Sequence, residues 1–339
     1  MKGLSIIRSQ EWWSHKLPPL LAIAYATVLM SPVPLFRVAH WALFLLCALV
    51  VGAIYVSVIN DITDLEEDIA SGKANRIQQV AEKYRWFIPA ICLLAGFIFG
   101  YFLYPDLLSC ALYLSSWIVF SLYSIKPIRL KNRGIFGVFA DGCGSHLFPS
   151  LLMVASMSYI TNQEINWIWF AAVGVWALTY GLRGILWHQF ADRLNDIKVN
   201  LNTYASKTTP AAFKNKGRFL IIVELAAFSV MLYKINLTLP FVGLGIYLLL
   251  VFLRYKINKT QVIIILKTND QPFQILMADY YQMFFPVSLL VAAFISEHYN
   301  VLILACHLFL FPHIFWLAIY DYFYFFKVFI HKVKHSFSK

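Results

Sequence analysis

Five acidic residues crowd into one nine-residue stretch, Asn60-Asp61-Ile62-Thr63-Asp64-Leu65-Glu66-Glu67-Asp68, although the chain of 339 residues has only 17. If the stretch is helical, spacings of three and four residues place Asp61, Asp64 and Asp68 within about 60° of one another. Three carboxylates on one face repel each other, and divalent cations would relieve that repulsion. Because Mg²⁺ takes carboxylate oxygens together with substrate phosphates and water, the stretch predicts a magnesium site that also binds phosphate.

A second acidic pair, Asp192 and Asp196, is one helical turn apart and shares a helix face. Such pairs are common in ordinary helices. Here, however, Asn195-Asp196-Ile197 repeats the tripeptide Asn60-Asp61-Ile62, and each follows an apolar segment on the same side of the predicted bundle. The repeat suggests a parallel duplication of a helical unit. We expect two carboxylate faces that hold two cations, with a diphosphate bridging the cations.

Basic residues lie close to the acidic motifs. Lys73 and Arg76 follow the first stretch, and residues 123–134 form a compact basic loop. Positive charge on cytoplasmic loops would by itself explain all of these residues. Because Arg76 and Lys126 lie beside the motif and at the membrane edge, we expect them to bind phosphate. Both interpretations stay open for three further loop residues, Arg129, Lys131 and Arg133.

Four ionisable residues lie within or at the end of apolar segments, where a charge is costly. His188 precedes Asp192 by one turn and shares its face, so we expect it to face a ligand. Arg183 is expected to snorkel, to pair with a carboxylate or to help bind the diphosphate. Asp141 and His146 are candidates for the end of the site that binds the second substrate, and Asp141 could also be a contact between helices.

Composition places these motifs in a membrane. Hydrophobic residues make up 60% of the chain and charged residues 13%, against about 45–50% and about 25% in soluble domains. The apolar residues form blocks of about 20, long enough to span a bilayer. The net charge of +11 lies between these blocks rather than on one face, which argues against nucleic-acid binding. The five cysteines form no CxxC pair, so neither a disulfide framework nor a zinc site is predicted.

The apolar blocks predict a single integral membrane domain, 1–339, in which residues 17–210 carry both acidic motifs and 217–326 complete the bundle. Segment 255–279 is too short in apolar length to span and is expected to be interfacial or re-entrant. With the N-terminus in the cytoplasm, ten spans place 26 of the 28 lysines and arginines on the cytoplasmic side. Both termini are therefore expected to be cytoplasmic, in an inner membrane. The spans are expected near 17–36, 38–59, 85–104, 107–124, 136–158, 165–188, 217–235, 237–254, 280–297 and 299–326.

These motifs resemble those of the UbiA superfamily of intramembrane prenyltransferases. The family's NDxxDxxxD motif is matched by residues 60–68, and its YSxxPxRxK loop resembles residues 123–131. Its DxxxD motif followed by GxxT resembles residues 192–203, with Asn200 in place of the glycine. Arg76 stands where the family has an arginine after the first motif, but the proline that follows in the family is absent.

The resemblance implies an all-α bundle of nine or ten spans and Mg²⁺-dependent transfer of a polyprenyl group from an allylic diphosphate to an aromatic or lipid acceptor. Two Mg²⁺ would be held by the motif aspartates, Asp61, Asp64, Asp68, Asp192 and Asp196. Basic residues would assist departure of the pyrophosphate, and aromatic faces would shield the carbocation. The further site residues expected are Asn60, Lys73, Arg76, Tyr123, Lys126, Arg129, Lys131, Arg183 and His188.

Two variants of the same fold remain open, a terpene cyclase and a polyprenyl-phosphate phosphoribosyltransferase. A cation-coupled secondary transporter is a more distant alternative. It would need carboxylates near the middle of the membrane, whereas these cluster at the cytoplasmic edge. A structural scaffold explains neither aspartate cluster.

Overall fold

The computed structural model describes residues 7–267 and 270–337, with side chains up to His331. Its main elements are α2 (Ser9–Leu29), α3 (Ala39–Thr63), α4 (Leu65–Ser71), α5 (Phe87–Leu103), α6 (Leu107–Ser124), α7 (Ile135–Gly142), the π-turn η5 (Cys143–Leu147), α8 (Phe148–Ile160), α9 (Trp167–Ala191), α10 (Arg193–Lys198), α11 (Tyr204–Lys207), α12 (Pro210–Ile235), α13 (Thr238–Ile257), β1 (Gln261–Ile263), β2 (Phe273–Ile275), the π-turn η6 (Tyr280–Phe284), α14 (Phe285–Ser296), α15 (Val301–Leu310) and α16 (Pro312–Phe337). Short 3₁₀ turns lie at Leu35–Val38, Arg76–Gln79, Glu82–Tyr84, Leu130–Asn132 and His298–Asn300.

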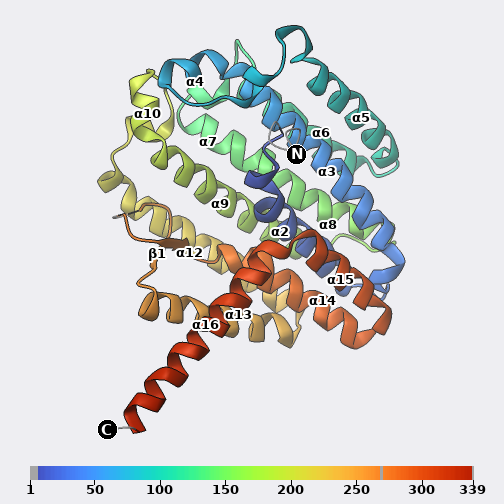
Figure 1. Cartoon of the computed structure of the whole chain (residues 1–339). Helices are drawn as coiled ribbons and strands as arrows, with labels where there is room; N and C mark the ends of the chain where they lie inside the picture. Colours follow the sequence, from blue (N-terminus) through green and yellow to red (C-terminus); the bar gives the residue numbers. More distant parts are fainter. Residues whose placement is uncertain (1–6, 268–269, 338–339) are drawn as a thin grey trace.

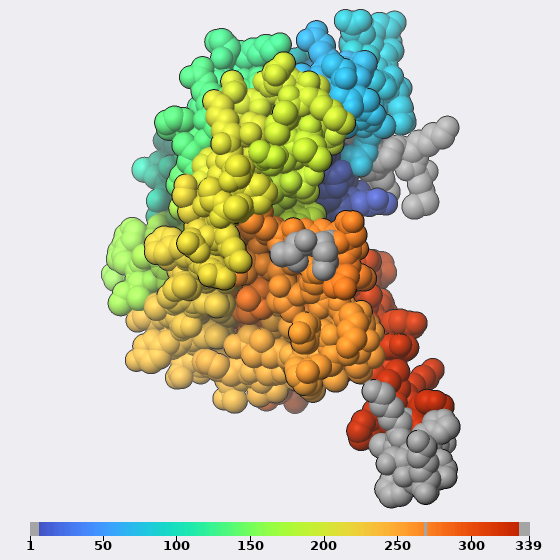
Figure 2. Space-filling view, turned by 90° about the vertical axis from the view of Figure 1, so that its left-hand side faces the viewer, coloured from blue at the N-terminus to red at the C-terminus, as the bar shows by residue number. Residues whose placement is uncertain are grey.

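The predicted all-helical membrane fold is confirmed. Within the described ranges, seven helical segments are long and apolar enough to cross a membrane, and Tyr280–Ser296 and His298–Leu310 are shorter apolar helices. The span predicted near 299–326 is divided, because Pro312 cannot continue the hydrogen-bond ladder of α15. After this break α16 extends away from the body of the molecule (Figures 1 and 2).

Helix α2 runs through the middle of the bundle (Figure 1). Its residues from Leu17 to Val28 are all buried, and it packs against α3, α8, α14 and η6. Large apolar side chains on the outer helices are instead exposed, as for Phe97 on α5, which is 70% exposed. An apolar exterior around a packed centre suits a protein surrounded by lipid, because exposing apolar side chains to lipid carries no hydrophobic cost. The first turns of α2 are thereby held at the centre of one end of the bundle.

Both acidic motifs lie at that same end, where Figure 1 shows α4 and α10. Described parts of the segment predicted to be interfacial or re-entrant, 255–279, pack on the helices of the bundle, as Phe273 does against Trp187 of α9. β1 and β2 form a parallel pair in which Gln261 lies opposite Phe273. Ile265, in the loop after β1, is 2% exposed and packs with residues of α7, α9 and α12. The segment therefore covers the bundle rather than lying free of it.

Candidate active site

The first acidic stretch is divided at Asp64. Helix α3 ends at Thr63 and α4 begins at Leu65, so the single continuous helix expected here is not formed. Hydrogen bonds of helical spacing nevertheless continue across the break, from the Asp64 N–H to the Asn60 carbonyl (2.9 Å) and from the Asp68 N–H to the Asp64 carbonyl (2.8 Å). Because the one-turn spacing survives, the three aspartates still face one cavity.

The second stretch repeats this break. Asp192 lies between α9 and α10 with φ −89° and ψ 0°, close to the −99° and −3° of Asp64. The N–H of Asp196 bonds to the Asp192 carbonyl at 3.0 Å, as Asp68 does to Asp64. The structural equivalents are therefore Asp64 with Asp192 and Asp68 with Asp196. The tripeptide repeat suggested a different alignment, which is wrong by seven residues, about two helical turns, because an identical short sequence says nothing about where a helix breaks.

The basic loop folds back onto the first acidic stretch. The Arg129 guanidinium bonds to the Asp64 carboxylate (2.9 Å) and to both oxygens of Glu67, while Lys131 also bonds to Asp64. Burial by itself lowers the pKa of Arg129, but the Glu67 and Asp64 contacts raise it above its ordinary value. The loop is joined to the second stretch as well, because the Gly134 N–H bonds to the Asn202 carbonyl at 2.9 Å.

Asn75 organises the turn after the first stretch. Its side-chain amide donates to the Asp61 carbonyl and to the Asp68 carboxylate, both at 2.8 Å, and its own oxygen accepts from the Ile77 N–H. The side chain is 5% exposed. Arg76, the next residue, bonds to Glu11 of α2 at 2.9 Å. This turn therefore ties the first acidic stretch to the start of the chain.

The second stretch has its own partners. Lys73 approaches the Asp192 carboxylate at 3.0 Å, and the Thr203 hydroxyl donates to Asp196 at 2.9 Å. Burial raises the pKa of Asp196, and the Thr203 hydrogen bond and the nearby charge of Lys73 offset only part of that shift. Lys73 follows the first stretch in sequence, so it links the two acidic faces.

A polar cavity brings most of the predicted residues together. Its walls come from α2, α3, α4, α6, α7, α9 and α10, and it also receives Asp141, a candidate for the acceptor end. The other predicted residues that line it are Asn60, Asp61, Asp64, Asp68, Lys73, Arg76, Tyr123, Lys131, His188, Asp192 and Asp196.

Five candidates do not line this cavity, among them Arg133, whose guanidinium donates to carbonyls of its own loop. Lys126 is exposed, because the chain leaves the cavity after Ser124, the last residue of α6. It returns to the first acidic stretch only at Arg129, which bonds to Asp64 from outside the cavity. Arg183 is 1% exposed and pairs with Glu224 of α12. It therefore pairs with a carboxylate, as one of the three predictions for it stated, and it does not lie where it could bind the diphosphate. His146 is buried in the π-turn, where its ring packs edge-on against Tyr180.

The start of α2 supplies residues that the motifs did not reveal. Arg8 bonds to Asp61 at 3.2 Å and to Glu11 at 2.7 Å, and Trp12 and Lys16 also line the polar cavity. Arg8 and Lys16 were counted only as charges at the cytoplasmic edge. The sequence does contain a signal for them, because Arg8 and Lys16 are eight residues apart, close to two helical turns. If the first helix begins before its apolar residues, this spacing puts both charges on the same side of it.

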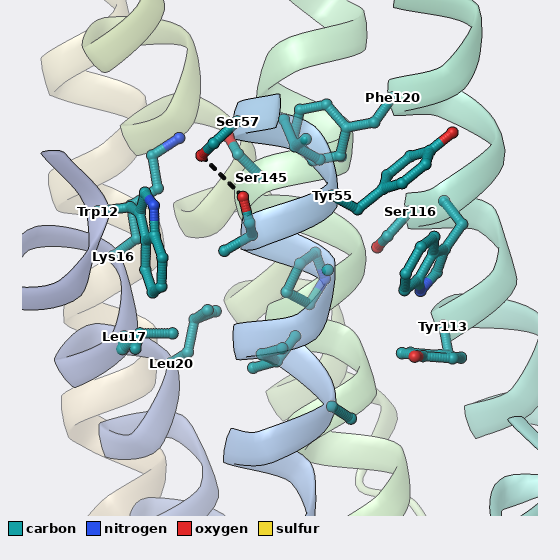
Figure 3. A pocket seen from close by; sticks show the side chains of 18 residues that line it. Trp12, Lys16, Leu17, Leu20, Tyr55, Ser57, Tyr113, Ser116, Phe120 and Ser145 are labelled. Atoms are coloured by element: carbon teal, nitrogen blue, oxygen red, sulfur yellow. Dashed lines mark hydrogen bonds between the residues drawn. The ribbon is translucent and has the colours of Figure 1, made fainter. Parts of the chain in front are cut away.

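An apolar cavity of about 730 Å³, including the open space at its mouth, adjoins the polar one. Its walls come from α2, α3, α6 and the turn from η5 into α8, and include Leu20, Gly52, Tyr113 and Pro149 (Figure 3). Five residues line both cavities: Trp12, Lys16, Val56, Ser57 and Phe120. A ligand with a polar end and an apolar chain can therefore occupy both.

The carboxylates fit magnesium by donor type, but they do not form a finished coordination sphere. Among the described residues, no three His, Cys, Asp or Glu side chains converge on one point. Each motif aspartate instead accepts a bond from a basic or polar side chain. Oδ2 of Asp61 is buried without a hydrogen-bond partner, which leaves one oxygen available to a cation. A cation on Asp64 or Asp192 would displace the amines of Lys131 and Lys73, which line the same cavity and would then be free to bind phosphate.

Comparison with known proteins supports the same picture. The profile of the family described as the UbiA prenyltransferase family matches residues 18–271, three quarters of the chain. This chain belongs to the UbiA prenyltransferase family. The match extends beyond residue 210, where the recognisable motifs end, into the helices that complete the bundle. No curated protein sequence matches the chain.

Solved structures of a UbiA homologue from Archaeoglobus fulgidus share the fold. The form bound to GPP and Mg²⁺ has a TM-score of 0.55 at 13% identity, covering 90% of this chain and 100% of that one. The form bound to DMAPP and Mg²⁺ has a TM-score of 0.52 at 12% identity, covering 90% and 99%. At this identity the likeness establishes the UbiA fold, while the site rests on the side chains described above.

Proposed function

We propose that this UbiA-family protein transfers an isoprenoid chain from an allylic diphosphate to an acceptor and releases pyrophosphate. The observation that carries the proposal is the pair of adjoining cavities, one lined by carboxylates and amines and the other almost wholly apolar. An allylic diphosphate has the same two parts, an anionic head and a hydrocarbon chain. The related Archaeoglobus fulgidus protein binds GPP and DMAPP together with Mg²⁺.

The two acidic stretches would hold two Mg²⁺, one set comprising Asp61, Asp64 and Asp68 and the other Asp192 and Asp196. When bound, such ions stabilise the negative charge that develops on a departing diphosphate. Lys73 and Lys131 would move from the aspartates to the phosphate oxygens. These cations already lie in the cavity wall, so only side-chain rotation is required.

The carbon that loses the diphosphate would lie where the cavities meet. Trp12 and Phe120 line that junction, and their faces would stabilise an allylic cation. The motifs would lie at the cytoplasmic side of an inner membrane with both termini cytoplasmic, and the apolar cavity would extend into the bilayer.

Mg²⁺-dependent pyrophosphate release by the purified protein tests this function, with geranyl, farnesyl and geranylgeranyl diphosphates as donors. We expect release that stops in EDTA and in an Asp64→Ala, Asp192→Ala double variant. Asp270→Ala, which removes a fully exposed carboxylate, is the matched control and should behave as the unaltered protein. Release that persists in EDTA or in the double variant would contradict the proposal. Mass analysis of products formed without acceptor separates transfer from cyclisation.

A further inference from the structure

Asp141 is a carboxylate that the metal and diphosphate sites leave unused. It lies on α7, within a segment long and apolar enough to span the membrane, and it lines the polar cavity. Ionisable residues at such positions are costly and usually serve function. Among the described residues no lysine, arginine or histidine forms an ion pair with it. Within the described part of the chain, its carboxylate accepts a hydrogen bond only from the hydroxyl of Ser145, at 3.4 Å.

Three of the five motif carboxylates differ in this respect. Asp61, Asp64 and Asp192 each pair with a cationic side chain, and these same oxygens are the proposed ligands of Mg²⁺. A nearby cation favours the ionised form of a carboxylate and makes it a poor proton acceptor. Asp141 has no such cation on it. Two ionisable cavity residues, His188 and Tyr123, lie near enough to interact electrostatically with Asp141.

Asp141 also lies at the junction of the two cavities. Ser145, one helical turn further on, lines the apolar cavity and donates to the Asp141 carbonyl at 2.7 Å. Figure 3 shows Ser145 beside Ser57, between the side chains of Lys16 and Phe120. Since Ser57, Lys16 and Phe120 line both cavities, the pair formed by Asp141 and Ser145 flanks the position proposed for the reacting carbon.

The backbone fixes this pair in place. The π-turn η5 begins immediately after Gly142, and such turns often occur at functional sites. A Cβ on Gly144 would lie 2.9 Å from the Phe120 ring, and one on Gly142 would lie 3.2 Å from Leu182. The absence of side chains at both glycines lets the turn pack closely between α6 and α9, which holds Asp141 toward the cavity.

We propose that Asp141 is the proton acceptor for the second substrate, whose nucleophilic atom therefore carries a proton, as in an alcohol or a phenol. This rests on the function proposed above. The bond from C1 of the allylic donor to the diphosphate oxygen breaks, and its electron pair leaves with pyrophosphate. The acceptor atom X bonds to C1, and the X–H proton passes to the Asp141 carboxylate, which later returns it to water.

The assignment can be tested without knowledge of the natural acceptor. Two nucleophiles are compared, one that must lose a proton when it reacts and one that has no proton to lose. Water must lose a proton to give geraniol from geranyl diphosphate, whereas the azide anion gives geranyl azide without losing one. Both products are measured in one reaction with Mg²⁺ by gas chromatography and mass spectrometry. Their ratio does not depend on how much enzyme is folded.

In Asp141→Asn we expect geraniol formation to fall about 100-fold, a typical contribution of a general base, while geranyl azide formation stays within about threefold of the unaltered protein. Asp141→Glu should restore part of the geraniol. Asp106→Asn, a carboxyl change outside both cavities, should keep the original ratio. An unchanged ratio in Asp141→Asn would overturn the assignment. Geranyl azide without geraniol from the unaltered protein would overturn the assignment alone. Absence of both products and of pyrophosphate release would instead overturn the proposed function, and the assignment with it.

Discussion

Arg183 of α9 and Glu224 of α12 form two parallel bonds of 2.6 and 2.7 Å inside the bundle. Their side chains are 1% and 0% exposed. Arg183 also donates to the carbonyls of Ile264 and Leu276, on either side of the β1–β2 loop. One side chain thereby joins two helices and the segment that packs on them, and its bonds to Glu224 are buried.

Removal of one partner of this pair should destabilise the protein strongly. Glu224→Ala leaves a buried, unpaired guanidinium, and we expect a loss of about 3–5 kcal/mol in the free energy of unfolding. The double variant Arg183→Met, Glu224→Leu should be markedly more stable than Glu224→Ala, because no charge remains to be buried. Thermal unfolding in detergent measures both. A double variant that unfolds at a lower temperature than Glu224→Ala would show that the charges themselves stabilise the bundle.

Asn75→Ala should weaken metal binding without unfolding the protein. The Asn75 side-chain amide donates hydrogen bonds to the Asp61 carbonyl and to the Asp68 carboxylate, so its loss leaves the Asp68 carboxylate free to rotate. Loss of a residue that orients a metal ligand typically costs 10–100-fold in affinity or activity. We expect the Mg²⁺ concentration for half-maximal pyrophosphate release to rise by about that factor. Gln78→Ala, an exposed amide in the same turn, serves as the control and should not change it.

Gly52→Leu should shorten the donor that the protein accepts. Gly52 lines the apolar cavity, nine residues before Asp61 on α3, or about 13 Å along the helix axis. A leucine side chain there would fill space needed by the far end of a long chain. We expect kcat/KM to fall at least about tenfold more for geranylgeranyl than for dimethylallyl diphosphate, since each isoprene unit adds buried apolar surface. Gly245→Leu, at an open position on α13, should affect both donors equally and little.

The metal-free protein should lose stability as the pH rises. Burial raises the pKa of Asp196, so the folded protein binds this proton more tightly than the unfolded chain does. The contribution to stability is complete below the unfolded carboxyl pKa, about 3.9, and is lost as the pH rises through the folded value. Thermal unfolding in EDTA over this range should show a decline that is smaller in Asp196→Asn. An identical decline in the variant would assign it to other groups.

The sequence by itself determined the class of protein and the identity of the acidic motifs. Apolar blocks of spanning length require helices, because a backbone in lipid must satisfy its own hydrogen bonds. Carboxylates at three- and four-residue spacing fall on one face of any helix. That relation survived the breaks at Asp64 and Asp192, since the local hydrogen bonds continue across them. Such properties depend on neighbours along the chain and can be derived from it.

Only the tertiary structure decided which charges meet. Arg129 contacts the first motif while Lys126, three residues earlier, is exposed, and Arg183 pairs with a carboxylate 41 positions away. The contribution of Arg8 and Lys16 depends on α2 passing through the centre of the bundle. Partners brought together by helix packing are separated by tens of residues and carry no common spacing, so no pattern along the chain records them.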